Sequence, residues 1–267
     1  MVKNRQFEIP FNHTEELLLF LEKNSNKLLR HVKHVLVAPY YEDYTSTRHK
    51  QAKKPLDRNT YEDHIQRLQN AGYIISLLFN MPETVEQSII DYYIGLGINT
   101  FIINSNALAK TIHNLGCTTI ASITKRLQLE NIKNEDLSMF DYIVLDYTFN
   151  ASLDRIQKLP KQYKYILMTN TTCDFTCDFH THWRENNNLQ CPILINGSKN
   201  STYIPQEDLG LFDEYISIYK LQGREFDTSY ICKDIMYYVY GLKKYRIYNI
   251  DTSGNYYYRY KEKEVKN

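Results

Sequence analysis

A regular alternation of short apolar runs with helical stretches constrains the fold more than any other feature of this sequence. Each run is a continuous apolar block, which is typical of strands covered on both faces, as in a parallel sheet. Most runs end at a polar residue such as Asn, Ser or Asp. The predicted strands are His34–Ala38, Tyr73–Phe79, Thr100–Ile103, Thr118–Ile123, Tyr142–Leu145, Lys164–Met168 and Tyr215–Tyr219, with Pro192–Ile195 as a further short strand.

Helices are predicted between these strands, so the chain reads as a series of βα units. The predicted helices cover residues 14–29, 58–70, 83–95, 106–115, 151–159 and 227–240. Seven to eight strands in this alternation favour a (β/α)₈ barrel, the TIM-like α/β fold. The alternative is a doubly wound open sheet, which usually has fewer strands. The chain has only 9 glycines and neither a GxGxxG nor a GxxxxGK loop, which disfavours that alternative.

The C-terminal residues have a different pattern from the barrel. Two tyrosine-rich runs flank the segment Asp251–Asn255, whose turn-forming residues predict a β-hairpin. We therefore expect a barrel domain over residues 1–242 and a small Tyr-rich β-hairpin appendage with a tail over residues 243–267.

Charge and hydropathy give no sign of a nucleic-acid or membrane partner. The 32 basic and 31 acidic residues leave a net charge of +1. The N-terminus lacks the apolar core of a signal peptide, and no run approaches the roughly 18 apolar residues that span a bilayer. We expect a cytoplasmic protein, and in a reducing compartment clustered cysteines favour a metal centre over a disulfide.

Polar residues follow most of the predicted strands, where the active sites of (β/α)₈ barrels lie. An alternative is that these residues only form turns, which Asn favours. We expect at least three of them to line one site. The set comprises Asn80, Asn104, Ser105, Ser122, Asp146, Asn170, Cys173 and Lys220.

Three of the five cysteines, Cys173, Cys177 and Cys191, lie within nineteen residues after the strand that ends at Met168. Their spacing differs from the C-x₂-C of most zinc sites, and His180 stands where a CxxxCxxC motif has its third cysteine. A fourth thiol, Cys232, follows on the next predicted helix. Four thiolates suit a [4Fe–4S] cluster, with zinc as the alternative. Cys232 also fits a small buried apolar residue.

Two further assignments concern single residues. The imidazole of His180 suits proton transfer near neutral pH, so this residue is a candidate general acid or base. A nucleophilic Cys177 with His180 as its base is the corresponding arrangement for a peptidase. Cys117 begins a strand at the opposite face of the predicted barrel, and we expect it to be a core residue.

The order of these residues resembles that of the collagenase-like peptidase family U32, over roughly residues 70 to 240. In that family a late barrel strand ends in an Asn and is followed by a cysteine pair and a third cysteine. A Lys-x-x-Gly-Arg motif and a helix carrying a fourth cysteine come next. The matching residues here are Asn170, Cys173, Cys177, Cys191, Lys220, Gly223, Arg224 and Cys232.

This resemblance implies a (β/α)₈ barrel that holds a [4Fe–4S] cluster on Cys173, Cys177, Cys191 and Cys232. Several members of the family act in hydroxylation of RNA bases or of a quinone precursor, and others are described as proteases. The expected function is therefore an iron–sulfur enzyme of modification or biosynthesis. Its substrate would be a small molecule, an RNA or a peptide, and it would need an electron donor.

The candidate catalytic residues are His180, Asp146, Lys220 and Arg224. Asp146 and Lys220 would hold substrate near the cluster, and Arg224 would neutralise the charge of the cluster or substrate, or bind strand-end carbonyls. Two alternatives stay open: a cysteine- or metal-dependent peptidase, and a non-catalytic protein with a structural metal site. No proline or arginine follows Cys177, which departs from the family pattern.

Overall fold

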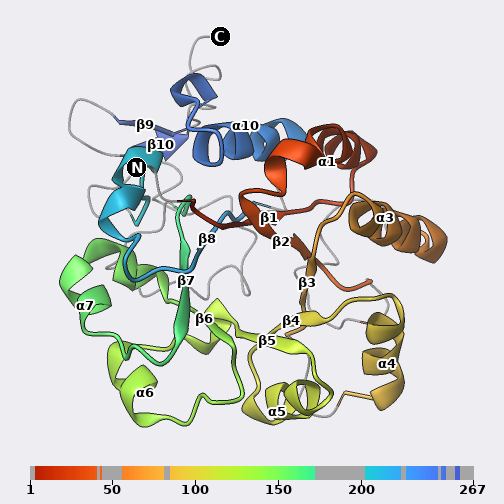
Figure 1. Cartoon of the computed structure of the whole chain (residues 1–267), viewed down its shortest axis with the longest axis horizontal. Helices are drawn as coiled ribbons and strands as arrows, with labels where there is room; N and C mark the ends of the chain where they lie inside the picture. The colour runs from red at the N-terminus through yellow and green to blue at the C-terminus, as the bar shows by residue number, and fades with distance from the viewer. Residues whose placement is uncertain are drawn as a thin grey trace.

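The computed structural model describes residues 4–40, 43, 56–80, 85–171, 202–223 and 227–245, and the backbone of 248–250 and 256–258. Its centre is a closed barrel of parallel strands in the order β1 to β8 (Figure 1). The strands are β1 (Phe7–Pro10), β2 (Val32–Val37), β3 (Ile75–Leu78), β4 (Thr100–Ile103), β5 (Thr118–Ala121), β6 (Tyr142–Val144), β7 (Lys164–Met168) and β8 (Ile218–Lys220). The predicted (β/α)₈ class is confirmed.

One correction concerns the strand that closes the barrel. The first strand was expected at His34–Ala38, but β1 (Phe7–Pro10) precedes it and pairs with both β2 and β8. The described strands therefore close the barrel without Pro192–Ile195, which lies outside the described residues. The register places Glu8 of β1 opposite His34 of β2 and opposite Lys220 of β8.

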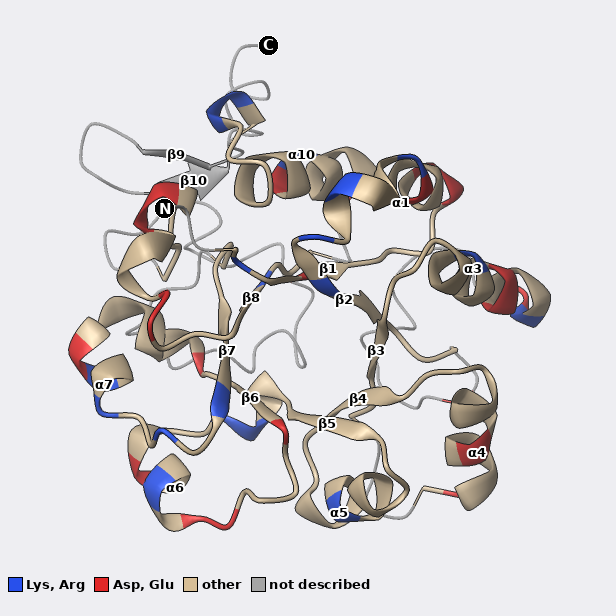
Figure 2. Ribbon diagram, in the orientation of Figure 1, with Lys and Arg blue, Asp and Glu red and all other residues tan. Residues whose placement is uncertain are grey.

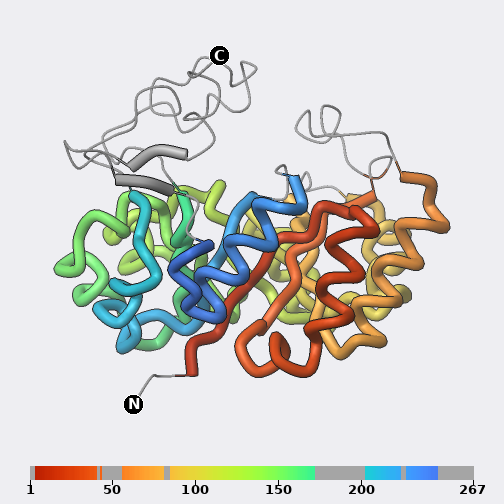
Figure 3. Tube along the Cα trace, turned by 90° about the horizontal axis from the view of Figure 1, so that it is seen from above, coloured from red at the N-terminus to blue at the C-terminus, as the bar shows by residue number. Residues whose placement is uncertain are grey.

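Helices surround the barrel, and Figure 3 shows α1 and α10 standing side by side. Several begin at a side chain that accepts a hydrogen bond from a free backbone N–H, which stabilises a helix start. Thr14 has this role for α1, Asp57 for α3 and Ser105 for α5. The α-helices are α1 (Glu15–Leu28), α3 (Arg58–Asn70), α4 (Gln87–Gly95), α5 (Asn106–Asn114), α6 (Leu129–Asn134), α7 (Leu153–Gln157) and α10 (Thr228–Tyr238).

Three of the scarce glycines end helices α3, α4 and α5. Gly72, Gly97 and Gly116 have φ angles of 94°, 77° and 79°, in the left-handed region that side chains other than glycine rarely adopt. Each turns the chain from a helix into the loop before the next strand. Three of the nine glycines thus serve the helix-to-strand connections of successive βα units.

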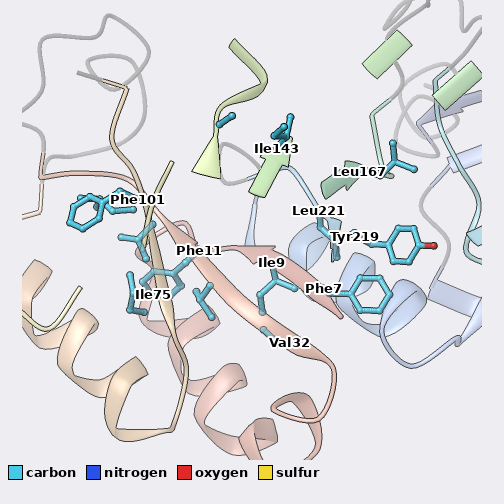
Figure 4. Packing of buried hydrophobic residues seen from close by; sticks show 14 of the residues in the cluster. Phe7, Ile9, Phe11, Val32, Ile75, Phe101, Ile143, Leu167, Tyr219 and Leu221 are labelled. Atoms are coloured by element: carbon cyan, nitrogen blue, oxygen red, sulfur yellow. The ribbon is translucent and has the colours of Figure 1, made fainter. Parts of the chain in front are cut away.

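Alternation along the strands separates two apolar layers. The inner layer fills the barrel with Leu36, Ile102, Ile120, Val144, Ile166, Met168 and Ile218. The outer layer lies between strands and helices and includes Phe7, Ile9, Phe101 and Leu167, shown in Figure 4. Because successive strand residues face opposite sides, the same alternation identifies which residues point toward the barrel axis at the strand ends.

The structure also bears on the predicted C-terminal hairpin. β9 (Tyr248–Ile250) and β10 (Tyr256–Tyr258) pair antiparallel, with Tyr256 opposite Ile250, which confirms the C-terminal hairpin. The domain division at residue 242 stays a prediction. Both basic and acidic residues lie on the surrounding helices, as Figure 2 shows. Among the described residues, no helix combines the length and apolarity needed to cross a membrane.

Candidate active site at the barrel mouth

Four polar residues converge at the carboxyl ends of β3, β4, β5 and β6, which we call the mouth. These mouth residues are Asn80, Asn104, Ser122 and Asp146. Each follows by two positions a residue of the inner layer or one packed against it: Leu78, Ile102, Ile120 and Val144. The alternation of strand residues therefore places all four on the side of the barrel axis. Ser105, which was expected beside them, instead accepts a hydrogen bond from the backbone N–H of Leu108 at 3.2 Å.

A hydrogen bond joins two of the mouth residues across the intervening strand. The amide Nδ2 of Asn80 donates to Oγ of Ser122 at 3.1 Å. These residues follow β3 and β5, so their side chains meet over the end of β4, the strand that precedes Asn104. Neighbouring strands lie about 5 Å apart, so the four mouth residues span about 15 Å of the barrel rim, from β3 to β6.

Asp146 is the charged member of the mouth and is only 1% exposed. Its Oδ1 accepts hydrogen bonds from the backbone N–H of Thr148 at 3.0 Å and from the Thr148 hydroxyl at 2.7 Å. Its Oδ2 has no hydrogen-bond partner among the described residues. The same holds for Oδ1 of Asn80 and Oδ1 of Asn104. Other buried atoms, such as Oδ1 of Asp234 and Oδ1 of Asn150, also lack partners among the described residues. The mouth differs in that three such acceptors follow neighbouring strands on one rim, which makes it a candidate ligand site.

Below the mouth, a charged network crosses the barrel interior. Glu8 is fully buried, and its carboxylate pairs with the ammonium of Lys220. The hydroxyl of Ser76 donates to Oε2 of Glu8 at 3.1 Å, and Nδ1 of His34 lies 3.6 Å from that oxygen. Burial raises the pKa of Glu8, but Lys220 and His34 outweigh it and lower that pKa to about 2.

Lys220 therefore has a position that the sequence did not indicate. It was expected among the residues of the mouth, but its ammonium is engaged by Glu8 within the barrel, and the residue is 6% exposed. The sequence did not identify Glu8 as a site residue, because the strand that carries it was not predicted. His34 begins a predicted strand, but its sequence position gave no sign of a role. A single Glu within an apolar tetrapeptide was the available signal.

On the β7 side of the rim, Asn170 joins two strand ends to a helix. Its Nδ2 donates to the carbonyl of Gln222 at 2.9 Å and to Oδ2 of Asp234 on α10 at 2.7 Å. Its Oδ1 accepts from the backbone N–H of Gln222 at 2.8 Å. Burial raises the pKa of Asp234 to about 7, although the hydrogen bond from Asn170 opposes this shift. Asn170 thus fixes the end of β7 against α10.

The segment with three cysteines begins and ends at this same place. Thr171 and Thr202 flank it, and the hydroxyl of Thr202 donates to the carbonyl of Thr171 at 3.4 Å. The amide of Asn150 donates to the carbonyls of Met168 and Thr202, both at 2.6 Å. Both ends of the segment are therefore held beside β7. This segment lies outside the described residues and contains Cys173, Cys177, His180 and Cys191. Arg224, which follows β8, also lies outside the described residues.

Cys232 is the one proposed cluster ligand that the structure describes. It lies on α10, partly buried against the outer apolar layer. Burial, together with the carboxylate of Glu16 on α1, raises the pKa of its thiol to about 11. Two residues on a helix are about 200° apart, so Cys232 and Asp234 project from different sides of α10. Cys117 is buried, as expected for a core residue.

Comparison with known proteins gives a likeness of fold. No family model matches the sequence, and no curated protein matches it. Among solved structures, the U32 peptidase Mk0906 aligns with 84% of this chain and 95% of its own, with a TM-score of 0.55 and 10% identity. CpGH84B aligns with 91% of this chain at a TM-score of 0.38, which is too low to carry an argument. The chain is thus similar to a U32 peptidase in its (β/α)₈ barrel, the fold that the sequence resemblance implied.

Proposed function

We propose that this protein is an iron–sulfur enzyme of the U32 kind, whose substrate binds at the barrel mouth. A [4Fe–4S] cluster would be held by Cys173, Cys177, Cys191 and Cys232. The observation that carries the proposal is the contact between Thr171 and Thr202. It brings both ends of the segment with three cysteines to the end of β7.

The donor chemistry of the chain fits such a cluster. Asn170 links the start of the cysteine segment to Asp234 of α10. Cys232 lies on the same helix but projects from another side of it. Four thiolates are the usual ligands of a [4Fe–4S] centre, and a bound cluster supplies one-electron transfer. Binding requires the thiols to lose their protons. Cys232 is the one proposed ligand that the structure describes, and burial and Glu16 disfavour its thiolate. It is therefore the most informative ligand to test.

The remaining candidate residues have separate tasks in this proposal. Asp146, with Asn80 and Asn104, binds and orients the substrate at the mouth. Lys220 forms a buried ion pair with Glu8 beneath the mouth. In this proposal Lys220 therefore has a structural role below the site and does not transfer a proton. His180 is the candidate proton donor or acceptor. Arg224 would balance negative charge on the cluster or substrate.

Anaerobic purification followed by iron and acid-labile sulfide assay tests the cofactor. We expect about four irons and four sulfides per chain, with visible absorption that reduction bleaches. Serine at Cys173, Cys177, Cys191 or Cys232 should lower the iron content, whereas Cys117→Ser, the matched control, should retain it. One zinc per chain, or no metal, would contradict the cluster.

The likeness to a solved U32 peptidase supports a second candidate, a cysteine peptidase. In that case Cys177→Ser abolishes cleavage of a casein substrate while the iron content of the protein stays unchanged. The iron–sulfur proposal makes the opposite prediction, because Cys177→Ser removes a cluster ligand. Measuring iron and proteolysis on the same preparation separates the two.

A further inference from the structure

The unpaired oxygens of the mouth indicate which kind of chemical group a ligand would need there. Asp146 is 1% exposed, and its Oδ2 has no hydrogen-bond partner within the described part of the chain. The same is true of Oδ1 of Asn80 and Oδ1 of Asn104. All three atoms are acceptors, so a group that fills this rim must donate hydrogen bonds.

The charge of Asp146 is also unbalanced by the described residues. The nearby guanidinium of Arg155 donates to Oε1 of Gln128 at 2.7 Å and approaches the Thr148 hydroxyl at 3.4 Å, rather than pairing with Asp146. Lys220 is engaged by Glu8, and the ammonium of Lys125 donates to the backbone carbonyl of Asn104 and to Oδ1 of Asn106. A buried carboxylate is costly to maintain without a positive partner, so a cationic ligand would balance the charge of this site.

We propose that the mouth binds the primary ammonium group of its substrate. An ammonium has three N–H donors and no acceptor, which matches three acceptor oxygens of which one is charged. Asp146 then provides the counter-charge, and Asn80 and Asn104 set the direction of the remaining N–H groups. This inference rests on the proposed function insofar as it names the chemical group held at the same site.

A divalent metal ion is the competing occupant of an oxygen-lined site. Calcium takes six to eight oxygen ligands, commonly with several carboxylates, and magnesium prefers carboxylates with phosphates and water. One carboxylate and two amides suit a hydrogen-bonded ammonium better than either ion. The two occupants differ in their need for N–H donors, and this difference makes them separable by experiment.

Isothermal titration with butylammonium chloride tests the proposal. Tetramethylammonium keeps the charge without N–H donors, and butanol keeps the chain without the charge. We expect butylammonium to bind about tenfold or more tightly than both, because a charge-assisted hydrogen bond is lost in each control. Magnesium and calcium chloride are titrated in parallel.

Asp146→Asn should weaken butylammonium binding about tenfold or more, and Asn104→Ala should weaken it severalfold. Asp146→Asn retains Oδ1 for Thr148, and Asn104→Ala tests the site independently if the first variant folds poorly. Asp154→Asn, on the exposed side of α7, is the control and should bind as the unaltered protein does.

Three results would overturn the proposal. These are equal binding by unaltered and Asp146→Asn protein, equal binding of butylammonium and tetramethylammonium, and Asp146-dependent binding of a divalent ion without binding of butylammonium. Iron is assayed on the same samples. Ammonium binding by protein that never acquires iron refutes the proposed cofactor alone, whereas iron-replete protein without ammonium binding refutes this inference alone.

Discussion

The barrel interior and the barrel mouth each bury a carboxylate, but the two carboxylates differ in how many of their oxygens have partners. Inside, Glu8 contacts Lys220, the Ser76 hydroxyl and the ring of His34. At the mouth, Asp146 uses one oxygen to cap the Thr148 backbone and leaves the other without a partner among the described residues. Both carboxylate oxygens of Glu8 thus have partners within the chain, and only one of the two oxygens of Asp146 has a partner among the described residues.

This difference in pairing predicts that Glu8 contributes to stability and Asp146 to ligand binding. A buried ion pair with its hydrogen bonds in place is costly to break, because removing one partner leaves the other charged and unpaired. An acceptor without a partner loses little when it is removed, because it made no interaction in the folded protein. We therefore expect interior substitutions to change the free energy of unfolding and mouth substitutions to change ligand binding.

The largest effect should come from removing the cation of the interior pair. Lys220→Met leaves Glu8 charged in the barrel and should lower the free energy of unfolding by about 3–5 kcal/mol, measured by urea denaturation. The double variant Glu8→Gln, Lys220→Met should recover most of that loss. A loss below about 1 kcal/mol in the single variant would show that the pair contributes little.

Acid should break the same pair without a mutation. The pKa of Glu8 falls from 4.5 to about 2 on folding, so its stabilisation is present above pH 4.5 and is lost as the pH falls toward 2. Urea midpoints measured across this range should decline more steeply for the unaltered protein than for the double variant. Parallel curves would argue against the depressed pKa.

Asn170 gives an intermediate case, since it lies at the rim but is fully paired. Asn170→Ala removes three hydrogen bonds and leaves the backbone of Gln222 and Oδ2 of Asp234 without them. We expect a loss of about 2–3 kcal/mol in urea denaturation. If the proposed cluster is present, iron content should also fall. An unchanged free energy of unfolding would contradict a stabilising role for the hydrogen bonds of Asn170 between β7 and α10.

The smallest change in stability should come from the mouth itself. Asp146→Asn retains the oxygen that accepts from Thr148 and removes a buried negative charge, so stability should change by no more than about 1 kcal/mol. Asn104→Ala should behave similarly. A loss above about 2 kcal/mol for either variant would mean that these side chains serve the fold, and the contrast with Glu8 would disappear.

The sequence predicted the architecture well because buried parallel strands leave a strong local signal. Seven of the eight barrel strands and most helices lie close to their expected positions. The exception, Phe7–Pro10, is four residues long, contains a proline and carries its only charge inward. Such a strand is stabilised by pairing with both β2 and β8, and long-range pairing has no local signature.

The candidate site was predictable only in part, for a related reason. Polar residues after strands identified Asn80, Asn104 and Asp146, because strand order alone brings strand ends together. The partner of Lys220 was not predictable, since Glu8 lies 212 positions away in the chain. The cluster ligands remain predictions from the cysteine order.

The joined ends of the cysteine segment have one more consequence. Thr171 and Thr202 are in contact, so the two described residues that flank residues 172–201 already lie side by side. A short glycine-containing linker between Thr171 and Thr202 could therefore replace residues 172–201 with little distortion of the flanking strands. Such a shortened variant would test directly which properties of the protein depend on residues 172–201.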